Sequence, residues 1–288
     1  MRIGRRRVVL VAAGLLGLAA VAFSQRFGGG RGGFRGFGGG GFSAEAPESE
    51  FPANAEFHFL RVEYHDDRGG GFGGFRNVSR RGRASGWWAQ DWPDADEHFT
   101  KGVQRLTRMD AGDPQHVALT DDKLFDYPWI YATQVGYWNL SNEETSRLRE
   151  YLLRGGFLMT DDFWDDQGPQ EWEVSTEAMN RVLPGQHITD IGLDDSVMHV
   201  LYDIQQKDLM FIPGSRHVGR DGQIYQPPGT KSAWRAMYDP KNRMVVSVNF
   251  DTDIGDAWEF ADVPYYPEGM TTLAYHYGIN YLMYAITH

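Results

Sequence analysis

The sequence predicts an α/β domain, a three-layer α/β/α sandwich built around a mainly parallel sheet. Short apolar segments, typical of buried parallel strands, alternate with segments of helical periodicity. One stretch, residues 128–160, carries the signals of a complete β-α-β unit. The chain has 288 residues, of which 41% are apolar, so it can bury the core of one ordinary domain.

The first part of this domain contains a strand, a helix and two shorter strands. Residues 57–64 alternate between apolar and polar with a period of two, as a strand does. Residues 96–106 carry apolar side chains at helical spacing. The apolar runs 117–119 and 129–132 suit interior strands of a parallel sheet.

The clearest local signal is a capping box at the start of the next helix. Ser141 can accept a hydrogen bond from the third helical residue, while Glu144 reaches back to the backbone of Ser141. Gly155 ends this helix, because a left-handed residue after a helix carries no steric penalty when it is glycine. The following residues, 157–160, form a strand.

The second part predicts a helix over 170–182 and a strongly buried strand over 244–250. We expect Thr271 or Thr272 to cap a terminal helix. Two further strands, at 198–201 and 209–212, are expected in the less regular region between the helix 170–182 and the strand 244–250.

Residues 1–24 are typical of an export signal. Arginines precede an apolar run, and Ala22 and Ser24 are small residues suited to a cleavage site. We expect the protein to be exported, periplasmic or secreted; if the signal stays uncleaved, it would anchor the chain in the membrane by its N-terminus. The absence of cysteine excludes a lipoprotein anchor, disulfides, thiolate metal sites and a cysteine nucleophile.

Residues 25–55 are rich in Gly, Arg and Phe and predict a disordered linker, which leaves residues 56–288 as one domain. A second glycine-rich stretch, 68–83, predicts a long loop. The formal net charge of −11 argues against a nucleic-acid partner. The basic linker is instead a flexible connection or an arm toward the cell surface and membrane-associated proteins.

Acidic residues follow two of the predicted strands. Asp161 and Asp162 follow the strand 157–160, and Asp251 and Asp253 follow the strand 244–250. Ligands in open α/β sheets bind beyond the carboxyl ends of strands, so these acids are candidate ligand-binding residues. The competing interpretation is that they cap helices or close turns. Candidates near them are Arg61 as a charge partner, with Trp164, Trp258 and Glu259.

No cofactor is expected; if an ion binds, Asp251 and Asp253 would hold Ca²⁺ or Mg²⁺, which prefer oxygen ligands. Trp87 and Trp88, with Asp91, form a second candidate feature. These indoles either present an aromatic platform to a sugar or peptide or pack over the sheet.

Several spaced motifs resemble a bacterial family, the domain of unknown function 4159. The resemblance covers about residues 57–287 and rests on segments 59–64, 127–131, 148–158, 160–162, 248–253, 258–259 and 277–280. It implies a flavodoxin-like fold similar to class I glutamine amidotransferases, and no established activity. Those enzymes use a cysteine at a strand-to-helix elbow, so glutaminase chemistry is excluded here.

Three hypotheses about function follow. The first is an exported ligand-binding or pseudo-enzyme module of the bacterial cell envelope, whose ligand is a small molecule, sugar or peptide. The second is a hydrolase of an envelope glycan or polymer, with Asp162 and Asp251 as its acid and base. The third is a structural module for protein interaction.

Overall fold

The computed structural model describes residues 55–66, 86–166, 170–230 and 233–288. The chain divides into two units, residues 1–46 and 47–288, and all described residues belong to the second. The predicted signal 1–24, the linker up to residue 54 and the loop 68–83 lie outside the described residues.

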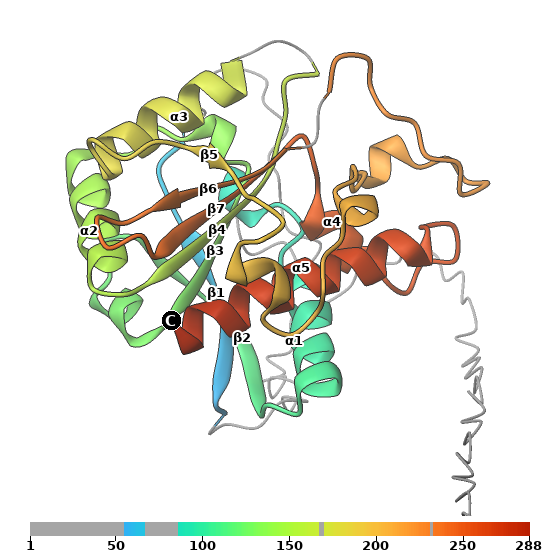
Figure 1. Cartoon of the computed structure of the whole chain (residues 1–288), viewed down its shortest axis with the longest axis horizontal. Coiled ribbons are helices and arrows are strands. Elements are labelled where there is room, and N and C mark those ends of the chain that lie inside the picture. The colour runs from blue at the N-terminus through green and yellow to red at the C-terminus, as the bar shows by residue number, and fades with distance from the viewer. Residues whose placement is uncertain (1–54, 67–85, 167–169, 231–232) are drawn as a thin grey trace, which may run out of the picture. The chain divides into compact units, whose positions relative to one another are not determined.

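A seven-stranded sheet in the order β2-β1-β3-β4-β7-β6-β5 forms the centre of this unit (Figure 1). The first five strands in that order pair in parallel, and β6 and β5 extend the sheet by antiparallel pairing. The α/β class and the mostly parallel sheet are therefore confirmed. The strands are β1 Phe57–Glu63, β2 Ala111–Ala118, β3 Trp129–Thr133, β4 Phe157–Phe163, β5 Thr189–Asp190, β6 Ala233–Tyr238 and β7 Met244–Phe250.

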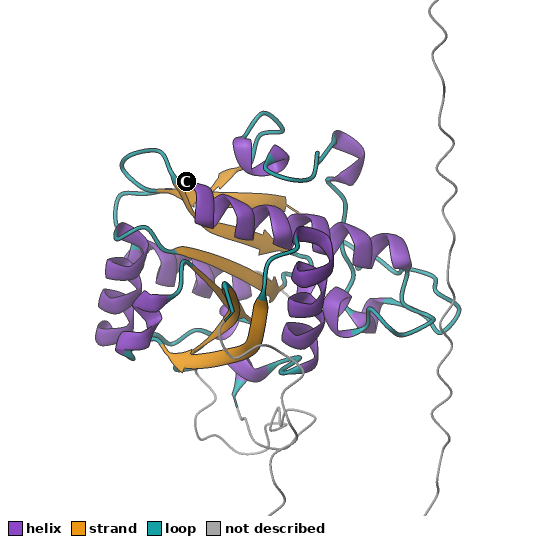
Figure 2. Cartoon of the chain, turned by 90° about the horizontal axis from the view of Figure 1, so that it is seen from below, coloured by secondary structure: helices purple, strands orange, loops and turns teal. Residues whose placement is uncertain are grey.

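Five α-helices accompany the sheet within the described part of the chain. In both views α2 and α3 lie together on one side, whereas α1 and α4 lie on the other (Figure 2). They are α1 Asp94–Thr107, α2 Asn142–Leu153, α3 Gln170–Val182, α4 Ile254–Glu259 and α5 Glu268–Thr287.

The core follows from the alternation of side chains along the strands. In β3, Trp129 and Tyr131 join one hydrophobic cluster, which includes residues of α1, α4 and α5. The intervening Ile130 and Ala132 join a second cluster, which includes residues of α2 and α3. Successive strand residues point to opposite faces, so β1, β3, β4 and β7 each contribute to both clusters.

The local signals of the β-α-β unit are confirmed. Ser141 Oγ accepts from Glu144 N at 3.1 Å, and Glu144 Oε2 accepts from Ser141 N at 2.8 Å. Gly155 has a φ of 115° just after α2, a conformation that glycine adopts without strain. The predicted strands β1, β3 and β7 and the helix α3 are also present.

Two predicted strands in the irregular region were wrong. Residues 198–201 begin in a short 3-10 turn, Ser196–His199, and 209–212 form no strand. Met198 and Ile212 are apolar because they fill the core from loops. The strands of this region are β5 and β6, which sequence patterns did not predict.

The end of the chain also differs from the prediction. Helix α5 begins at Glu268 after Pro267, so neither Thr271 nor Thr272 caps it. Proline fixes the backbone that enters a helix and needs no N–H there, so it starts this helix in place of a hydroxyl cap. None of the described helices is long and apolar enough to cross a membrane.

Candidate functional site

Strands β4 and β7 are parallel neighbours, so their carboxyl ends meet at one edge of the sheet. Between Thr160 and Phe163 the pairing of β4 with β7 shifts by one residue, which is a β-bulge. Within it Asp162 has a φ of 51°, in the left-handed region that few non-glycine residues adopt. The bulge thus places the consecutive residues Asp161 and Asp162 at this edge, and both are buried.

Asp161 is fully buried and connects three elements. Its Oδ2 accepts from Tyr131 Oη at 3.0 Å and from Gly255 N, in α4, at 2.8 Å. Its Oδ1 is shielded from solvent and has no hydrogen-bond partner among the described residues. The nearby backbone of Ile254 also favours the ionised form of Asp161, but the pKa of the carboxyl stays raised overall.

The other two acids next to the strand ends bind protein groups. Asp162 accepts from Trp164 Nε1 at 2.7 Å with one oxygen and from Gln134 Nε2 with the other. Asp251 Oδ1 accepts from Asp165 N at 3.0 Å. Both side chains are buried, so neither is an acid or base facing an open cleft, as glycoside hydrolysis requires.

Helix α4 brings two more carboxylates to the edge. Asp253 caps the helix, with its Oδ1 accepting from Asp256 N at 2.8 Å. Asp256 Oδ2 accepts from Ser215 N at 2.5 Å, from a neighbouring loop. The competing interpretation of the sequence, that these acids cap helices, is therefore correct for Asp253.

Arg61 positions a third element, the segment that follows η1 (Trp87–Ala89). Its guanidinium makes two hydrogen bonds to the carboxylate of Asp96, at 2.6 and 3.0 Å. It also donates to the backbone carbonyls of Trp88 and Gln90. Burial opposes the charge of Arg61, but Asp96 raises the pKa of the guanidinium overall. Arg61 therefore anchors this segment and is not a partner of Asp161.

We call the carboxyl ends of β4 and β7 and the start of α4, with Asp161, Asp162, Asp251, Asp253 and Asp256, the acidic edge. The anchored segment places Asp91 beside it. Asp91 has a φ of 63°, and its Oδ1 accepts from Gln90 Nε2 at 2.6 Å. Its Oδ2 is shielded from solvent and has no hydrogen-bond partner among the described residues. Each of Asp91, Asp253 and Asp256 offers one carboxylate oxygen, and these three oxygens lie within 4.8 Å of one another.

This crowding changes the acidity of the site. Burial raises the pKa of Asp91 well above its ordinary value, and the charge of Asp256 raises it further. Burial and the charge of Asp162 do the same to the pKa values of Asp161 and Asp253. The positive groups among the described residues therefore do not offset the effect of burial and mutual repulsion on these carboxylates.

The structure brings some predicted residues together and separates others. Asp253 and Asp91 belong to the group of three, whereas Asp251, offered as a metal ligand, holds the turn at Asp165. Glu259 is half-buried at the end of α4, and its charge also raises the pKa of Asp91.

The predicted aromatic residues have different surroundings. Trp258 has no exposed surface and packs on Phe99, with ring centroids 4.3 Å apart. Trp88 and Trp164 are buried as well. Trp87 is half-buried and stacks on Tyr137 at 4.2 Å, so it is the member of this set with a ring surface near solvent.

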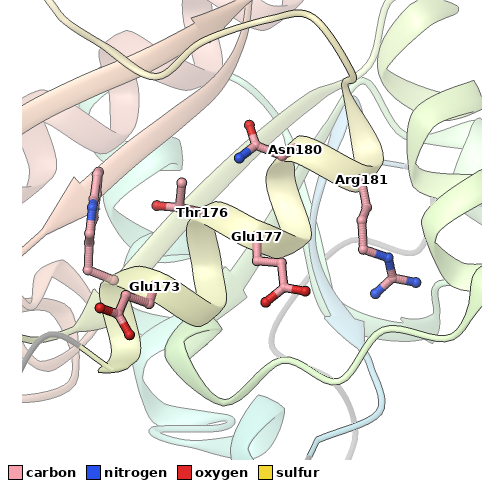
Figure 3. Close-up of a pocket in the computed structure, with 6 residues that line it drawn as sticks. Glu173, Thr176, Glu177, Asn180 and Arg181 are labelled. Atoms are coloured by element: carbon pink, nitrogen blue, oxygen red, sulfur yellow. The ribbon is translucent and has the colours of Figure 1, made fainter.

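Three surface hollows among the described residues lie away from the acidic edge. Two lie at the opposite edge of the sheet, near Gly155. The third, of about 450 Å³, lies over α3 (Figure 3) and is lined by Trp172, Glu173, Thr176, Glu177, Asn180 and Arg181. These residues come from one helix, and they include no member of the acidic group.

The sequence indicated Asp256 only as a further acid beyond the strand 244–250, and it did not indicate that Tyr131 and Gln134 belong to this edge. The signal available for Asp256 was its spacing from Asp253, because an aspartate three residues after an N-cap lies in the first turn of a helix. No local pattern connects Tyr131 or Gln134 to Asp161 and Asp162, because those contacts depend on the order of the strands.

Comparison with protein families matches residues 75–286 to the domain of unknown function DUF4159. A search of curated proteins finds none that matches the chain. The family match covers more than half of the chain and includes Asp91, both ends of the bulge and all of α4. The chain therefore belongs to the DUF4159 family.

Proposed function

We propose that this protein is an exported ligand-binding domain of the bacterial cell envelope, with its site at the acidic edge of the sheet. The observation that carries the proposal is the convergence of Asp91, Asp161 and Asp253 from three distant segments. Ligands of open α/β sheets bind at this edge, beyond the carboxyl ends of the strands. Export is supported by the signal-like residues 1–24.

We infer further that the fold is a flavodoxin-like, three-layer sandwich related to class I glutamine amidotransferases. The parallel strands have the order β2-β1-β3-β4-β7, and flavodoxin-like sheets have the order 2-1-3-4-5. The two hydrophobic clusters, which include residues of different helices, support helices on both faces.

A binding role is favoured over catalysis by the residue at the turn after β3. Gln134 follows this strand with a φ of 53° and precedes a 3-10 turn. A strained left-handed residue between strand and helix is the position in which hydrolases present a nucleophile. Here the position holds an amide, which is not a nucleophile, and the amide is hydrogen-bonded to Asp162.

Isothermal titration calorimetry of the full chain tests this function. N-acetylglucosamine oligomers, alanine-containing peptides, CaCl₂ and MgCl₂ are the probes, with the organic probes also measured in EDTA. We expect at least one probe to bind and the affinity for an organic probe to fall in Trp87→Ala. Phe125→Ala is the matched control, since Phe125 is a half-buried aromatic residue beside the opposite edge. If no probe binds, or if both variants behave alike toward every organic probe that binds, the proposal is wrong.

A further inference from the structure

The acidic edge also points to the chemical class of one ligand, an inference that rests on the proposed binding function. We propose that Asp91, Asp253 and Asp256 together bind one hard divalent cation, Ca²⁺ or Mg²⁺. The three carboxylates come from the segment after η1 and from the start of α4, and the sheet edge brings them together.

The spacing of the oxygens fits such an ion. One oxygen from each of the three side chains lies within 4.8 Å of the other two. Ca²⁺ binds oxygen at about 2.3–2.6 Å and Mg²⁺ at about 2.0–2.1 Å, so two ligands of one ion are separated by at most about twice that distance. A single ion can therefore contact all three carboxylates with only small movements of the side chains.

Asp161 provides a second observation that points to a ligand. It is fully buried, and its Oδ1 lacks a hydrogen-bond partner among the described residues. The position that a Cβ would take on Gly255 is 3.1 Å from Asp91 Oδ2 and 3.6 Å from Asp161 Oδ2. Asp161 Oδ2 thus lies beside the same residue of α4 as Asp91 Oδ2, and Asp161 adds negative charge near the three ligands.

Two guanidinium groups of the described structure, Arg61 and Arg216, offset this charge only in part. Arg61 is bound to the carboxylate of Asp96. Arg216 stacks over Trp164 at 4.9 Å from the ring centroid and has half of its side chain exposed. Its closest carboxylate contact in the described structure is Asp166, at 3.9 Å. Buried carboxylates without a cation are unfavourable, so a metal ion would stabilise this arrangement.

Protein donors hold each ligand in place through one oxygen. Gln90 Nε2 binds Asp91 Oδ1, Asp256 N binds Asp253 Oδ1, and Ser215 N binds Asp256 Oδ2. Because each carboxylate oxygen has two lone pairs, each side chain keeps acceptor capacity for an ion. Donors that orient ligands in this way strengthen a metal site.

Gly214 lies where a side chain would obstruct the site. A Cβ on Gly214 would lie 2.7 Å from Asp253 Oδ2 and 3.3 Å from Asp256 Oδ2. Its φ of −64° is accessible to alanine. Gly214→Ala therefore disturbs the carboxylates without removing a charge or straining its own backbone.

The test is calorimetric titration of the EDTA-treated full chain with CaCl₂ and with MgCl₂, in parallel with thermal unfolding. We expect one ion per chain and an increase in the melting temperature when it binds. Asp91→Asn, Asp256→Asn and Gly214→Ala should each weaken binding by at least about tenfold. Asparagine tolerates the left-handed backbone of residue 91, so Asp91→Asn should fold. Glu177→Gln, an exposed acid of α3, is the control and should bind as the wild type does.

Thermal unfolding in EDTA distinguishes carboxylates that bind a metal ion from carboxylates that only stabilise the fold. If the carboxylates repel one another, Asp91→Asn should melt at or above the wild-type temperature in EDTA and gain nothing from Ca²⁺ or Mg²⁺. The cation site is refuted if neither ion binds to the wild type, or if Asp91→Asn and Asp256→Asn bind as tightly as Glu177→Gln. Binding of an organic probe in EDTA, lost in Trp87→Ala, would then show that the proposed binding function survives without the ion.

Discussion

The N-terminus of α2 and the acidic edge both contain buried carboxylates, but the pKa values of the two groups shift in opposite directions. Glu144 is 3% exposed, yet it accepts hydrogen bonds from Ser141 N and His65 N, at 2.8 and 3.0 Å. Burial alone would raise its pKa, but these hydrogen bonds lower the pKa overall. At the acidic edge, burial and neighbouring charges raise the pKa values of Asp91 and Asp253.

The difference shows that burial alone does not decide whether a carboxylate is stable as an anion: hydrogen-bond donors favour the anion, and neighbouring negative charges oppose it. Glu144 has a backbone donor at each carboxylate oxygen, and its role is structural. The carboxylates of the acidic edge also have donors, but they are deeply buried and lie beside one another, so their ionised forms are unfavourable together. Sites of this kind are candidates for function because a ligand can remove the conflict.

The largest effect on stability is expected when the buried ion pair between Arg61 and Asp96, beside the acidic edge, is broken. Arg61→Met leaves Asp96 buried without its partner and releases the carbonyls of Trp88 and Gln90. We expect the free energy of unfolding to fall by about 3–5 kcal/mol, measured by urea unfolding. The double variant Arg61→Met, Asp96→Leu should recover much of this loss, since no buried charge remains. A loss under about 1 kcal/mol in the single variant would contradict the role of Arg61 as an anchor.

An intermediate effect on stability is expected at Glu144, whose carboxylate oxygens both accept hydrogen bonds. Glu144→Ala removes the acceptor for Ser141 N and His65 N, and should lower the free energy of unfolding by about 1–2 kcal/mol at pH 7. Glu144→Gln should lose less, because glutamine also completes a capping box.

The pH dependence of this effect has a defined sign. The pKa of Glu144 is lower in the folded protein than its ordinary value of 4.5. Its stabilisation is therefore fully present above pH 4.5 and is lost as the pH falls through the lowered value. Urea unfolding at pH 7 and at successively lower pH should show the wild type and Glu144→Ala converging in acid. A difference that grows in acid would contradict the assignment.

The smallest effect is expected at the cap of α4. In Asp253→Asn the side chain can still accept from Asp256 N, and one negative charge is removed from the edge. The free energy of unfolding without metal should change by less than about 0.5 kcal/mol, whereas Asp253→Ala should lose about 1 kcal/mol. Chemical unfolding in EDTA distinguishes them, and equal losses in both variants would mean that the charge itself stabilises the edge.

Local signals predicted the β-α-β unit because every contact of the capping box lies within a few residues. The same reasoning missed β6, since its position beside β7 is fixed by pairing rather than by a distinctive pattern. It also placed Asp161 and Asp162 after β4, whereas they belong to its bulged end.

The acidic edge was predicted from the expectation that β4 and β7 are neighbours, and that pairing is present. Its membership could not be predicted in full. Asp91 reaches the edge because Arg61 binds Asp96, and that ion pair spans residues far apart in the chain. Asp256 reaches it on α4, a helix too short to give a periodic signal.

Diffraction from crystals of the full chain soaked in CaCl₂ tests the central claim most directly. We expect one calcium peak in the anomalous map, about 2.3–2.6 Å from a carboxylate oxygen of each of Asp91, Asp253 and Asp256. A map without calcium at this edge, at a concentration that saturates any binding seen by calorimetry, would contradict it.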